Sequence, residues 1–463
     1  MKLTKISLAM AGVLAASNAF ALSPTAIDPQ NPTANDIVIH YGGATAQSQT
    51  VKDLTSTLCQ AGTRDEYNND PADPTHLAIT CTLAAPAALA NKNLYFSYYL
   101  NGGSVYGVTP VADQVPLNYM GVNPANGGNC TETAPGSHSW TCANQPANQY
   151  SVAPVAGGSD VEPAMFKGSN VAGLAFPAPS AAGLANLTVS PGFEVIFGIA
   201  VNNALLDPTA DNDGDGNPDY PNGTGTIKSL SKSSIAAIFA GSKVLWEQVP
   251  EFGHLEDLVT GANATDIQVC RRKAGSGTQA SAQAYFLNQE CSDTGRTFVT
   301  AATSPGALPV QEISSSTKIL TQCEEPSNQA LAISSLEKQP NRADDKYGHN
   351  WEYVAIDGIL PTEENAALGK YDYMFENSMQ YNNAYTNADQ KAFLNELFAA
   401  AKESSVLAGL PGVLGVPDFV VNTPGDLTDS NGNGVYLEYL PSNPVAWTTR
   451  DTQACKKPLA VFP

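Results

Sequence analysis

Basic residues are scarce in this sequence. Its 463 residues include 23 lysines and arginines against 44 aspartates and glutamates, which gives a net charge of −21 at pH 7. A surface with such an excess of negative charge repels nucleic acids and anionic membranes, so neither is expected as a partner. Only 14% of the chain is charged, but 43% is hydrophobic, which is ample for buried cores and indicates an ordered protein.

Long apolar runs are also missing. The run Ile6–Ala16 is too short to anchor a mature protein in a bilayer. It follows Lys2 and Lys5 and precedes the small residues around Ala19–Ala21, which predicts a cleaved secretory signal peptide over residues 1–21. No cysteine lies near the cleavage point, so a lipid anchor is not expected. These features predict a soluble protein in the periplasm or the medium, without membrane insertion.

Several motifs for catalysis and metal ligation are absent. The sequence has no CxxC pair, no GxSxG elbow and no HExxH helix, and its five histidines show no ligand spacing. The eight cysteines are an even number in a chain expected to be exported, which favours disulfides over metal ligation. Proximity in the sequence suggests the pairs Cys59–Cys81, Cys130–Cys142 and Cys270–Cys291, which leaves Cys323 with Cys455. We therefore expect a non-catalytic protein without an organic cofactor.

Signals for strands, turns and helices alternate along the chain. Apolar runs rich in β-branched residues end in Gly or Ser and lead into helical stretches, as in IVIHYGGATAQ, LYFSYYLNGGSVYGV, FEVIFGIAVNN, IQVCRRKAGSGT and WEYVAIDGIL. The clearest helices begin near Ser231 or Ser233, and near Asn387 or Asp389, which are suitable capping residues. This alternation predicts an α/β architecture with amphipathic helices on the outside of a sheet.

The stretch Arg272–Thr278, RKAGSGT, predicts a binding site for an anion. A strand that ends in Gly-Ser-Gly-Thr and leads into a helix presents unpaired backbone N–H groups at the positive end of the helix dipole. Ser276, Gly277 and Thr278 supply backbone and hydroxyl donors, and Arg272 supplies a planar fork for two oxygens of a tetrahedral anion. The alternative is an exposed turn beside a salt-bridged arginine.

Three further glycine-bearing loops favour the anion site. HYGGATAQ offers Thr45, NGGSVYG offers Ser104, and GGSDVEP places Asp160 after two glycines and a serine. An aspartate is useful among anion-binding groups because it accepts a hydrogen bond from a protonated anion and repels an anion without a proton. Together the loops predict one site for a small oxyanion.

These motifs, in this order, resemble those of the periplasmic phosphate-binding proteins of phosphate ABC importers. The matching stretches are GGAT at Gly42–Thr45, GGS at Gly102–Ser104, GGSDVEP at Gly157–Pro163 and RKAGSGT at Arg272–Thr278. LSKSSIAAIFAGSKVLWEQ is similar to the family's helix that ends in Ile-Phe-x-Gly, with a tryptophan shortly after. The resemblance implies a two-lobed periplasmic-binding-protein-like α/β fold, in which each lobe is a central mixed sheet flanked by helices.

The resemblance also implies how the chain is divided and what it does. Lobe I would comprise residues 22–196 and 352–463 and lobe II residues 197–351, joined by two hinge strands near EVIFGIAVN and WEYVAIDGI. The implied protein binds phosphate or a related tetrahedral oxyanion between the lobes without catalysis, and an importer permease is a candidate partner. The implied ligand-binding residues are Thr45, Ser104 and Asp160 from lobe I, with Arg272, Ser276, Gly277 and Thr278 from lobe II.

Two positions depart from the family pattern. Ala274 stands where the family has an acidic residue, so we expect Arg272 to lack the partner that would hold its fork. Ala46 stands where a bulky residue often follows the threonine of the first motif. Both departures are compatible with an anion site and leave the identity of the oxyanion open.

An acidic stretch, DPTADNDGDGNPDYPNG, has the spacing of a calcium loop. The oxygen ligands Asp211, Asp213, Asp215 and Asp219 surround a turn at Gly216 and suit Ca²⁺ in a structural role. Because the twelfth position is Asn222 and not glutamate, a loop of the dockerin or thrombospondin type fits better than an EF-hand. The alternative for this stretch is a solvated turn. For the whole protein, one alternative is an extracellular structural or adhesive calcium-binding protein on the same fold, and another is an exported phosphoesterase.

Overall fold

A computed structural model gives the fold of most of the chain. It describes residues 24–71, 74–174, 177–202, 228–252, 267–289, 291, 295–300, 309–316, 318–319, 323, 330–336 and 351–402, and short strands at 413–415, 419–423, 426–429, 447–448 and 459–460. The expected signal peptide, the expected calcium ligands and Cys455 lie outside the described residues. Among the described helices, none is long and apolar enough to cross a membrane.

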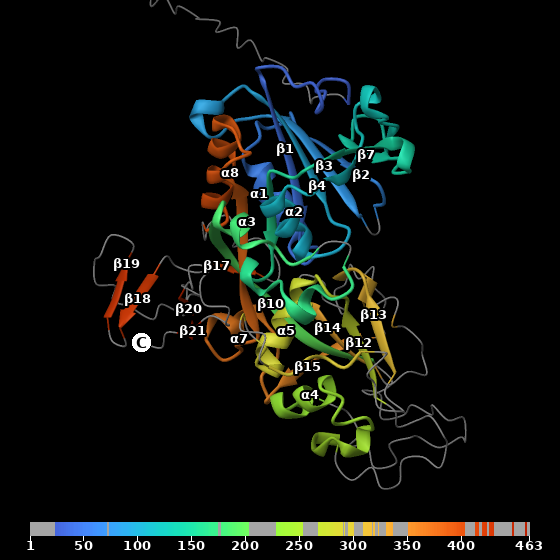
Figure 1. The fold of residues 1–463 in the computed structure, drawn as a ribbon, viewed down its shortest axis with the longest axis vertical. Helices are drawn as coiled ribbons and strands as arrows, with labels where there is room; N and C mark the ends of the chain where they lie inside the picture. Colours follow the sequence, from blue (N-terminus) through green and yellow to red (C-terminus); the bar gives the residue numbers. More distant parts are fainter. Residues whose placement is uncertain are drawn as a thin grey trace, which may run out of the picture.

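The expected two-lobed α/β fold is confirmed, and the strands of both lobes belong to one continuous mixed sheet and not to a separate sheet in each lobe (Figure 1). Its strands follow the order β13-β12-β14-β10-β16-β9-β1-β4-β3-β2-β7-β6. Lobe I contains β1 (Asp36–Gly43), β2 (Asp65–Asn68), β3 (His76–Thr82), β4 (Asn93–Tyr99), β6 (Cys130–Glu132), β7 (Ser139–Cys142) and β9 (Ala156–Ser159). Lobe II contains β11 (Ser229–Leu230), β12 (Gln268–Arg272), β13 (Val310–Ile313), β14 (Ala330–Ser335) and β15 (Trp351–Ile356). In each lobe parallel pairs, such as β1 with β4 and β12 with β13, adjoin antiparallel ones.

Parallel pairing explains why the binding loops cluster. β1 is parallel to both β4 and β9, so the loops that follow these three strands leave the same edge of the lobe I sheet. β12 is likewise parallel to β13 in lobe II. Loops at the carboxyl ends of parallel strands are the usual ligand-binding edge of an open α/β sheet.

Two long strands connect the lobes. β10 (Leu187–Asn202) pairs with β16 (Met374–Asn382) along its first part, and with β14 and β15 along its second part. The expected crossing within FEVIFGIAVNN therefore lies in β10. The register of β10 against β16 shifts between Pro191 and Glu194, which marks a bulge where the strand leaves lobe I.

The second crossing differs from the prediction. The first six residues of WEYVAIDGI form β15, which pairs with the lobe II part of β10 and with β11, so it does not lead into lobe I. β16 is the second crossing strand, because it pairs with β10 and with β9 of lobe I. The sequence of β16, MFENSMQYN, is rich in polar residues and does not have the apolar pattern expected of a buried strand, although every residue in it is buried. The boundary expected at residue 352 falls within β15.

Helices cover the sheet on the outside of each lobe. Lobe I has α1 (Ser48–Thr57), α2 (Thr109–Asp113), α3 (Ala181–Ala185) and α8 (Ala388–Ala400); lobe II has α4 (Lys232–Phe239), α5 (Gly277–Leu287) and α7 (Glu363–Ala367). Two of the expected caps are present: Ser231 accepts a hydrogen bond from the Ser234 amide, and Asn387 accepts one from the Gln390 amide. The remaining described strands are β5 (Leu117–Met120), β8 (Gln149–Val152), β17 (Val413–Gly415), β18 (Phe419–Thr423), β19 (Asp426–Asp429), β20 (Trp447–Thr448) and β21 (Leu459–Ala460).

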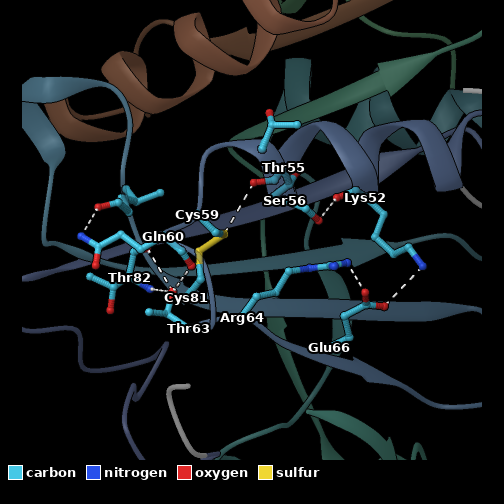
Figure 2. Close-up of a disulfide and its surroundings, with 12 residues drawn as sticks. Lys52, Thr55, Ser56, Cys59, Gln60, Thr63, Arg64, Glu66, Cys81 and Thr82 are labelled. Atoms are coloured by element: carbon cyan, nitrogen blue, oxygen red, sulfur yellow. Dashed lines mark hydrogen bonds and ion pairs between the residues drawn. A yellow bond between two sulfur atoms is a disulfide. The ribbon is translucent and has the colours of Figure 1, made fainter. Parts of the chain in front are cut away.

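Two of the four expected disulfides are confirmed, and the other two, Cys270–Cys291 and Cys323–Cys455, are wrong. Cys59–Cys81 joins the end of α1 to β3 (Figure 2), and Cys130–Cys142 joins β6 to β7. Cys270 pairs with Cys323 and not with Cys291. Cys270 lies on β12, and Cys323 follows β13, the neighbour of β12 in the sheet. Proximity in the fold therefore overrides proximity in the sequence. Cys291 is itself disulfide-bonded.

Candidate anion-binding site

The seven predicted site residues come together where the two lobes face each other. Ser104 of lobe I contacts both Asp160 of lobe I and Gly277 of lobe II through its hydroxyl oxygen. Thr45 of lobe I lies 3.4 Å from the hydroxyl of Ser316, which binds Arg272. All seven are buried, and the exposed fraction is at most 7% for the six that carry side chains with polar atoms: Thr45, Ser104, Asp160, Arg272, Ser276 and Thr278. Their role in binding remains a prediction.

Direct backbone hydrogen bonds hold the two lobes together beside these residues. The amide of Val105 in lobe I donates to the carbonyl of Gly275 in lobe II at 2.9 Å, and the amide of Gly275 donates to the carbonyl of Asn170 at 2.7 Å. Gly103 has a φ of 86°, and a Cβ atom there would lie 3.0 Å from the Cα of Ser276. Glycine at 103 therefore both permits the left-handed backbone and lets the loops approach this closely.

The amino terminus of α5 faces Asp160. Ser276 caps this helix by accepting a hydrogen bond from the Gln279 amide at 3.3 Å, and the Gly277 amide donates to Ser104 at 3.1 Å. A Cβ atom at Gly277 would lie 2.8 Å from an Asp160 carboxylate oxygen. The positive end of the helix dipole therefore points at the loops of lobe I, where negative charge is stabilised.

Thr278 has an unused hydroxyl in this region. Its side chain is 1% exposed, and its Oγ1 atom has no hydrogen-bond partner within the described part of the chain. A buried hydroxyl without a partner costs free energy. A polar guest beside the start of α5 would supply the missing partner.

Arg272 is buried and held by neutral groups. Its Nε donates to the Ile313 carbonyl at 3.3 Å, one terminal nitrogen donates to the Ser314 carbonyl at 3.0 Å, and the other donates to the Ser316 hydroxyl. The expectation that Arg272 lacks a partner because of Ala274 is therefore wrong, since two carbonyls and a hydroxyl fix its fork. These three bonds use three of the five guanidinium N–H groups.

The charge on Arg272 persists at neutral pH. Burial lowers its pKa to about 10, and the negative charge of Asp160 opposes this shift. The alternative of an exposed turn beside a salt-bridged arginine is not what the structure contains, because Arg272 is 1% exposed and the arginine ion-paired to Glu312 is its neighbour Arg271. The start of the motif is a buried cation that faces a carboxylate across the lobes.

Buried histidines in lobe I add no positive charge at neutral pH. His40 contacts the Tyr150 hydroxyl at 3.0 Å, and His76 contacts the Asn118 carbonyl at 2.9 Å. Burial lowers the pKa of each to about 4, so both are neutral at pH 7. Both therefore serve as neutral hydrogen-bonding groups inside lobe I.

Ser316 and Gln47 are site residues that the sequence reasoning missed. Besides binding Arg272, Ser316 directs its amide toward the Thr45 hydroxyl at 3.5 Å. Its stretch, QEISSSTKIL, has the same pattern of a strand, a small polar turn and a helix start as the motifs that were recognised, and Ser315 caps the Lys318 amide at 3.1 Å. Gln47 donates to Asp160 at 3.1 Å. Only its position two residues after Thr45 could have indicated it.

Comparisons with known proteins find similarity in structure alone. No family model matches the sequence, and no curated protein matches it. One similar solved structure is a Clostridium perfringens protein described as a phosphate ABC transporter substrate-binding protein, with bound phosphate: 11% identity, TM-score 0.44, covering 82% of this chain and 99% of that one. PstS from Borrelia burgdorferi has 12% identity and a TM-score of 0.35, covering 82% and 98%. An ABC-type phosphate transport receptor from Vibrio cholerae has 16% identity and a TM-score of 0.33, covering 57% and 80%.

Proposed function

We propose that this protein is a non-catalytic solute-binding protein that holds phosphate or a related tetrahedral oxyanion between its lobes. The observation that carries the proposal is that three features of lobe II face the loops of Ser104 and Asp160 across the lobes: a buried arginine, a helix amino terminus and a buried hydroxyl that has no partner among the described residues. Fixed dipoles and one cation can replace the hydration shell of a small anion. Asp160 then favours an anion that carries a proton, since it can accept the hydrogen bond of that proton.

The location and partners belong to the same proposal. An exported solute-binding protein works in the periplasm or outside the cell and delivers its ligand to an importer permease. The expected signal peptide fits this role, and so does the acidic surface, because charges more than about 10 Å from the site are screened at physiological salt. Ca²⁺ at Asp211, Asp213, Asp215 and Asp219 stays a separate prediction for a stretch outside the described residues.

The direct test is titration of the mature protein with inorganic phosphate. Isothermal titration should show uptake of one phosphate per chain, and phosphate at 100 times its dissociation constant should stabilise the fold by about 2.7 kcal/mol in thermal unfolding. Sulfate, arsenate and a phosphonate serve as comparison anions. The proposal fails if none of the four anions binds, or if the protein turns over an aryl phosphate and loses that turnover when Ser104 is changed to alanine.

Ser316→Ala should weaken phosphate binding about tenfold. Ser316 supplies one of the three groups that hold the Arg272 fork, and losing a hydrogen bond to a charged group costs about 1.5 kcal/mol. Titration with phosphate measures the change. Ser315→Ala is the matched control, because Ser315 caps the following turn and makes no described contact with Arg272. Equal affinity of Ser316→Ala and the unmodified protein would contradict the role of Ser316.

A further inference from the structure

A chain of hydrogen bonds connects Asp160 to the bulge in the hinge strand β10. Gln47 Nε2 donates to Asp160 Oδ1 at 3.1 Å, Asn377 Nδ2 donates to Gln47 Oε1 at 2.7 Å, and the Phe193 amide donates to Asn377 Oδ1 at 2.9 Å. The side chains of Gln47 and Asn377 are fully buried. Phe193 lies within the register shift between Pro191 and Glu194. The candidate site is thus linked to the place where the chain crosses between the lobes.

The Phe193 amide fixes which group donates and which accepts in every hydrogen bond of this chain. A backbone N–H can only donate, so the Phe193 amide requires Asn377 to present its oxygen. Asn377 must then present its NH₂ group to Gln47, which in turn presents its own NH₂ group to Asp160. Asp160 Oδ1 is therefore obliged to accept.

A second chain imposes the same requirement on the other carboxylate oxygen. The amides of Asp160 and Gly277 both donate to Ser104 Oγ, at 3.2 and 3.1 Å. These two bonds use the lone pairs of the hydroxyl, so its proton points to Asp160 Oδ2 at 3.1 Å. A donor is therefore directed at each oxygen of Asp160, and hydrogen bonds of this kind favour the carboxylate over the protonated acid.

The two chains begin in different parts of the molecule. One begins at the hinge, where Asn377 also packs so tightly against β10 that a Cβ atom at Gly192 would lie 2.2 Å from its oxygen. The other begins at the amino terminus of α5 in lobe II. Movement of either the hinge or lobe II would therefore alter the donors directed at Asp160.

We propose that Gln47 and Asn377 are positioning residues of the anion site, which direct a donor at the Asp160 carboxylate and tie it to the hinge. The inference rests on the proposed function. It adds two residues to the anion site and an influence of the hinge on that site. In the arrangement seen here, Asp160 presents only acceptors to a bound anion. A change in the hinge that breaks the Phe193–Asn377 bond frees both amides to turn over, which removes the donor from Asp160 and weakens its hold on a protonated guest.

The test replaces the donor at Gln47 by a carboxylate, which can donate a hydrogen bond again only when it is protonated. Gln47→Glu places a second carboxylate beside Asp160, and the pair then shares one proton with a raised apparent pKa. The introduced carboxyl group, once protonated, can donate to Asp160 and accept from Asn377 as glutamine does. Relative to the unmodified protein at the same pH, phosphate affinity should be about a hundredfold weaker at pH 8 and should recover to within about fivefold at pH 5.5.

The matched variant Gln47→Met removes the donor without adding a charge. It keeps the length and volume of the side chain, so it should weaken phosphate binding about tenfold at both pH values, with no recovery on acidification. Measuring each variant against the unmodified protein cancels the titration of phosphate itself. A purely packing role for Gln47 predicts no loss of affinity in Gln47→Met, because that side chain fills the same space.

Several charged or titratable groups surround this chain. They are Asp160 and Arg272 in the site, Tyr41 on β1, and Glu194 and Glu376 at the hinge; Lys52, on the helix that follows Gln47, pairs with Glu66 at 3.3 Å. All of them are present in both variants and in the unmodified protein. They therefore affect the pH profiles of all three proteins alike. A recovery of phosphate affinity at low pH that occurs in Gln47→Glu alone reports the new carboxylate.

Asn377→Asp gives a second test if Gln47→Glu does not fold at pH 8. The carboxylate introduced by this substitution would accept from Phe193 and from Gln47, which turns the oxygen of Gln47 toward Asp160, so the same recovery at low pH is expected. Asn382→Asp is the control, because Asn382 is equally buried on β16 but binds the carbonyls of Val111 and Ala112.

If the unmodified protein binds phosphate and Gln47→Glu follows Gln47→Met at both pH values, the positioning role is wrong and the proposed function stands. If the unmodified protein binds no phosphate, both are wrong.

Discussion

Arg272→Met is expected to weaken phosphate binding about a thousandfold, close to abolishing it. The guanidinium is the cation that the described part of the site presents to an anion, and it is 1% exposed, so water cannot replace it. Removing one partner from a buried charged interaction costs about 3–5 kcal/mol. Methionine has a similar length and no charge, so the packing between β12 and β13 should change little. Isothermal titration measures the loss, and unfolding by denaturant checks that the variant is folded.

Arg271→Met is the matched control for this prediction. Arg271 is the preceding residue on the same strand, and it pairs with Glu312, whose side chain is partly exposed, at 2.8 Å. Its loss should lower stability slightly and leave phosphate affinity within about threefold, since a partly exposed ion pair contributes about 1 kcal/mol or less. Equal losses of affinity in the two variants would mean that the effect of Arg272 is not specific, and would contradict the proposed site.

Local patterns predicted the parts of the fold that depend on local chemistry. Glycine turns after apolar runs identified β1, β4 and β12 and the loops that follow them, because such turns need the backbone freedom of glycine wherever they occur. Ser231 and Asn387 were among the expected caps because an N-terminal side-chain acceptor satisfies amides within three residues of itself. The four motifs that contribute to the site are each of this local kind.

Features set by distant contacts were missed. β16 is polar in sequence because Ser378, Gln380 and Asn382 bind backbone carbonyls of lobe I, and these partners lie more than 200 residues away. The strand therefore has no apolar pattern to indicate burial. The same reason applies to Arg272, whose carbonyl partners at Ile313 and Ser314 carry no side-chain signal at all.

The polar core at the crossing has a consequence for stability and motion. Apolar contacts across a hinge tolerate sliding, whereas a buried hydrogen bond that breaks leaves a group unsatisfied at a cost of about 1–3 kcal/mol. Gln47, Asn377 and Asp160 therefore favour a small number of discrete arrangements over a continuum. The proposed binding of an anion between the lobes would make use of this property if the lobes open and close.

The double substitution Cys270→Ala and Cys323→Ala is expected to lower the free energy of unfolding by about 4 kcal/mol. This loss is larger than the one expected when the Cys130–Cys142 bond is removed. The Cys270–Cys323 bond spans a sequence separation of 53, and closing a longer loop restricts the unfolded chain more. Cys130→Ala with Cys142→Ala, across a separation of 12, should cost about 3 kcal/mol. Denaturant unfolding under non-reducing conditions measures both.

Thiol titration of the unfolded Cys270→Ala/Cys323→Ala protein decides between the two possible partners of Cys270. The Cys270–Cys323 bond leaves no free thiol behind, whereas the pairs suggested by sequence proximity would leave Cys291 and Cys455 free.

Removal of the Cys270–Cys323 bond should also affect phosphate binding. Cys270 lies two residues before Arg272, and Cys323 follows Ser316 by seven, so the bond ties the strand that carries the arginine to the segment that holds its fork. We therefore expect phosphate affinity to fall severalfold in this variant, and to stay unchanged when Cys130–Cys142 is removed, because that bond lies at the far edge of the lobe I sheet.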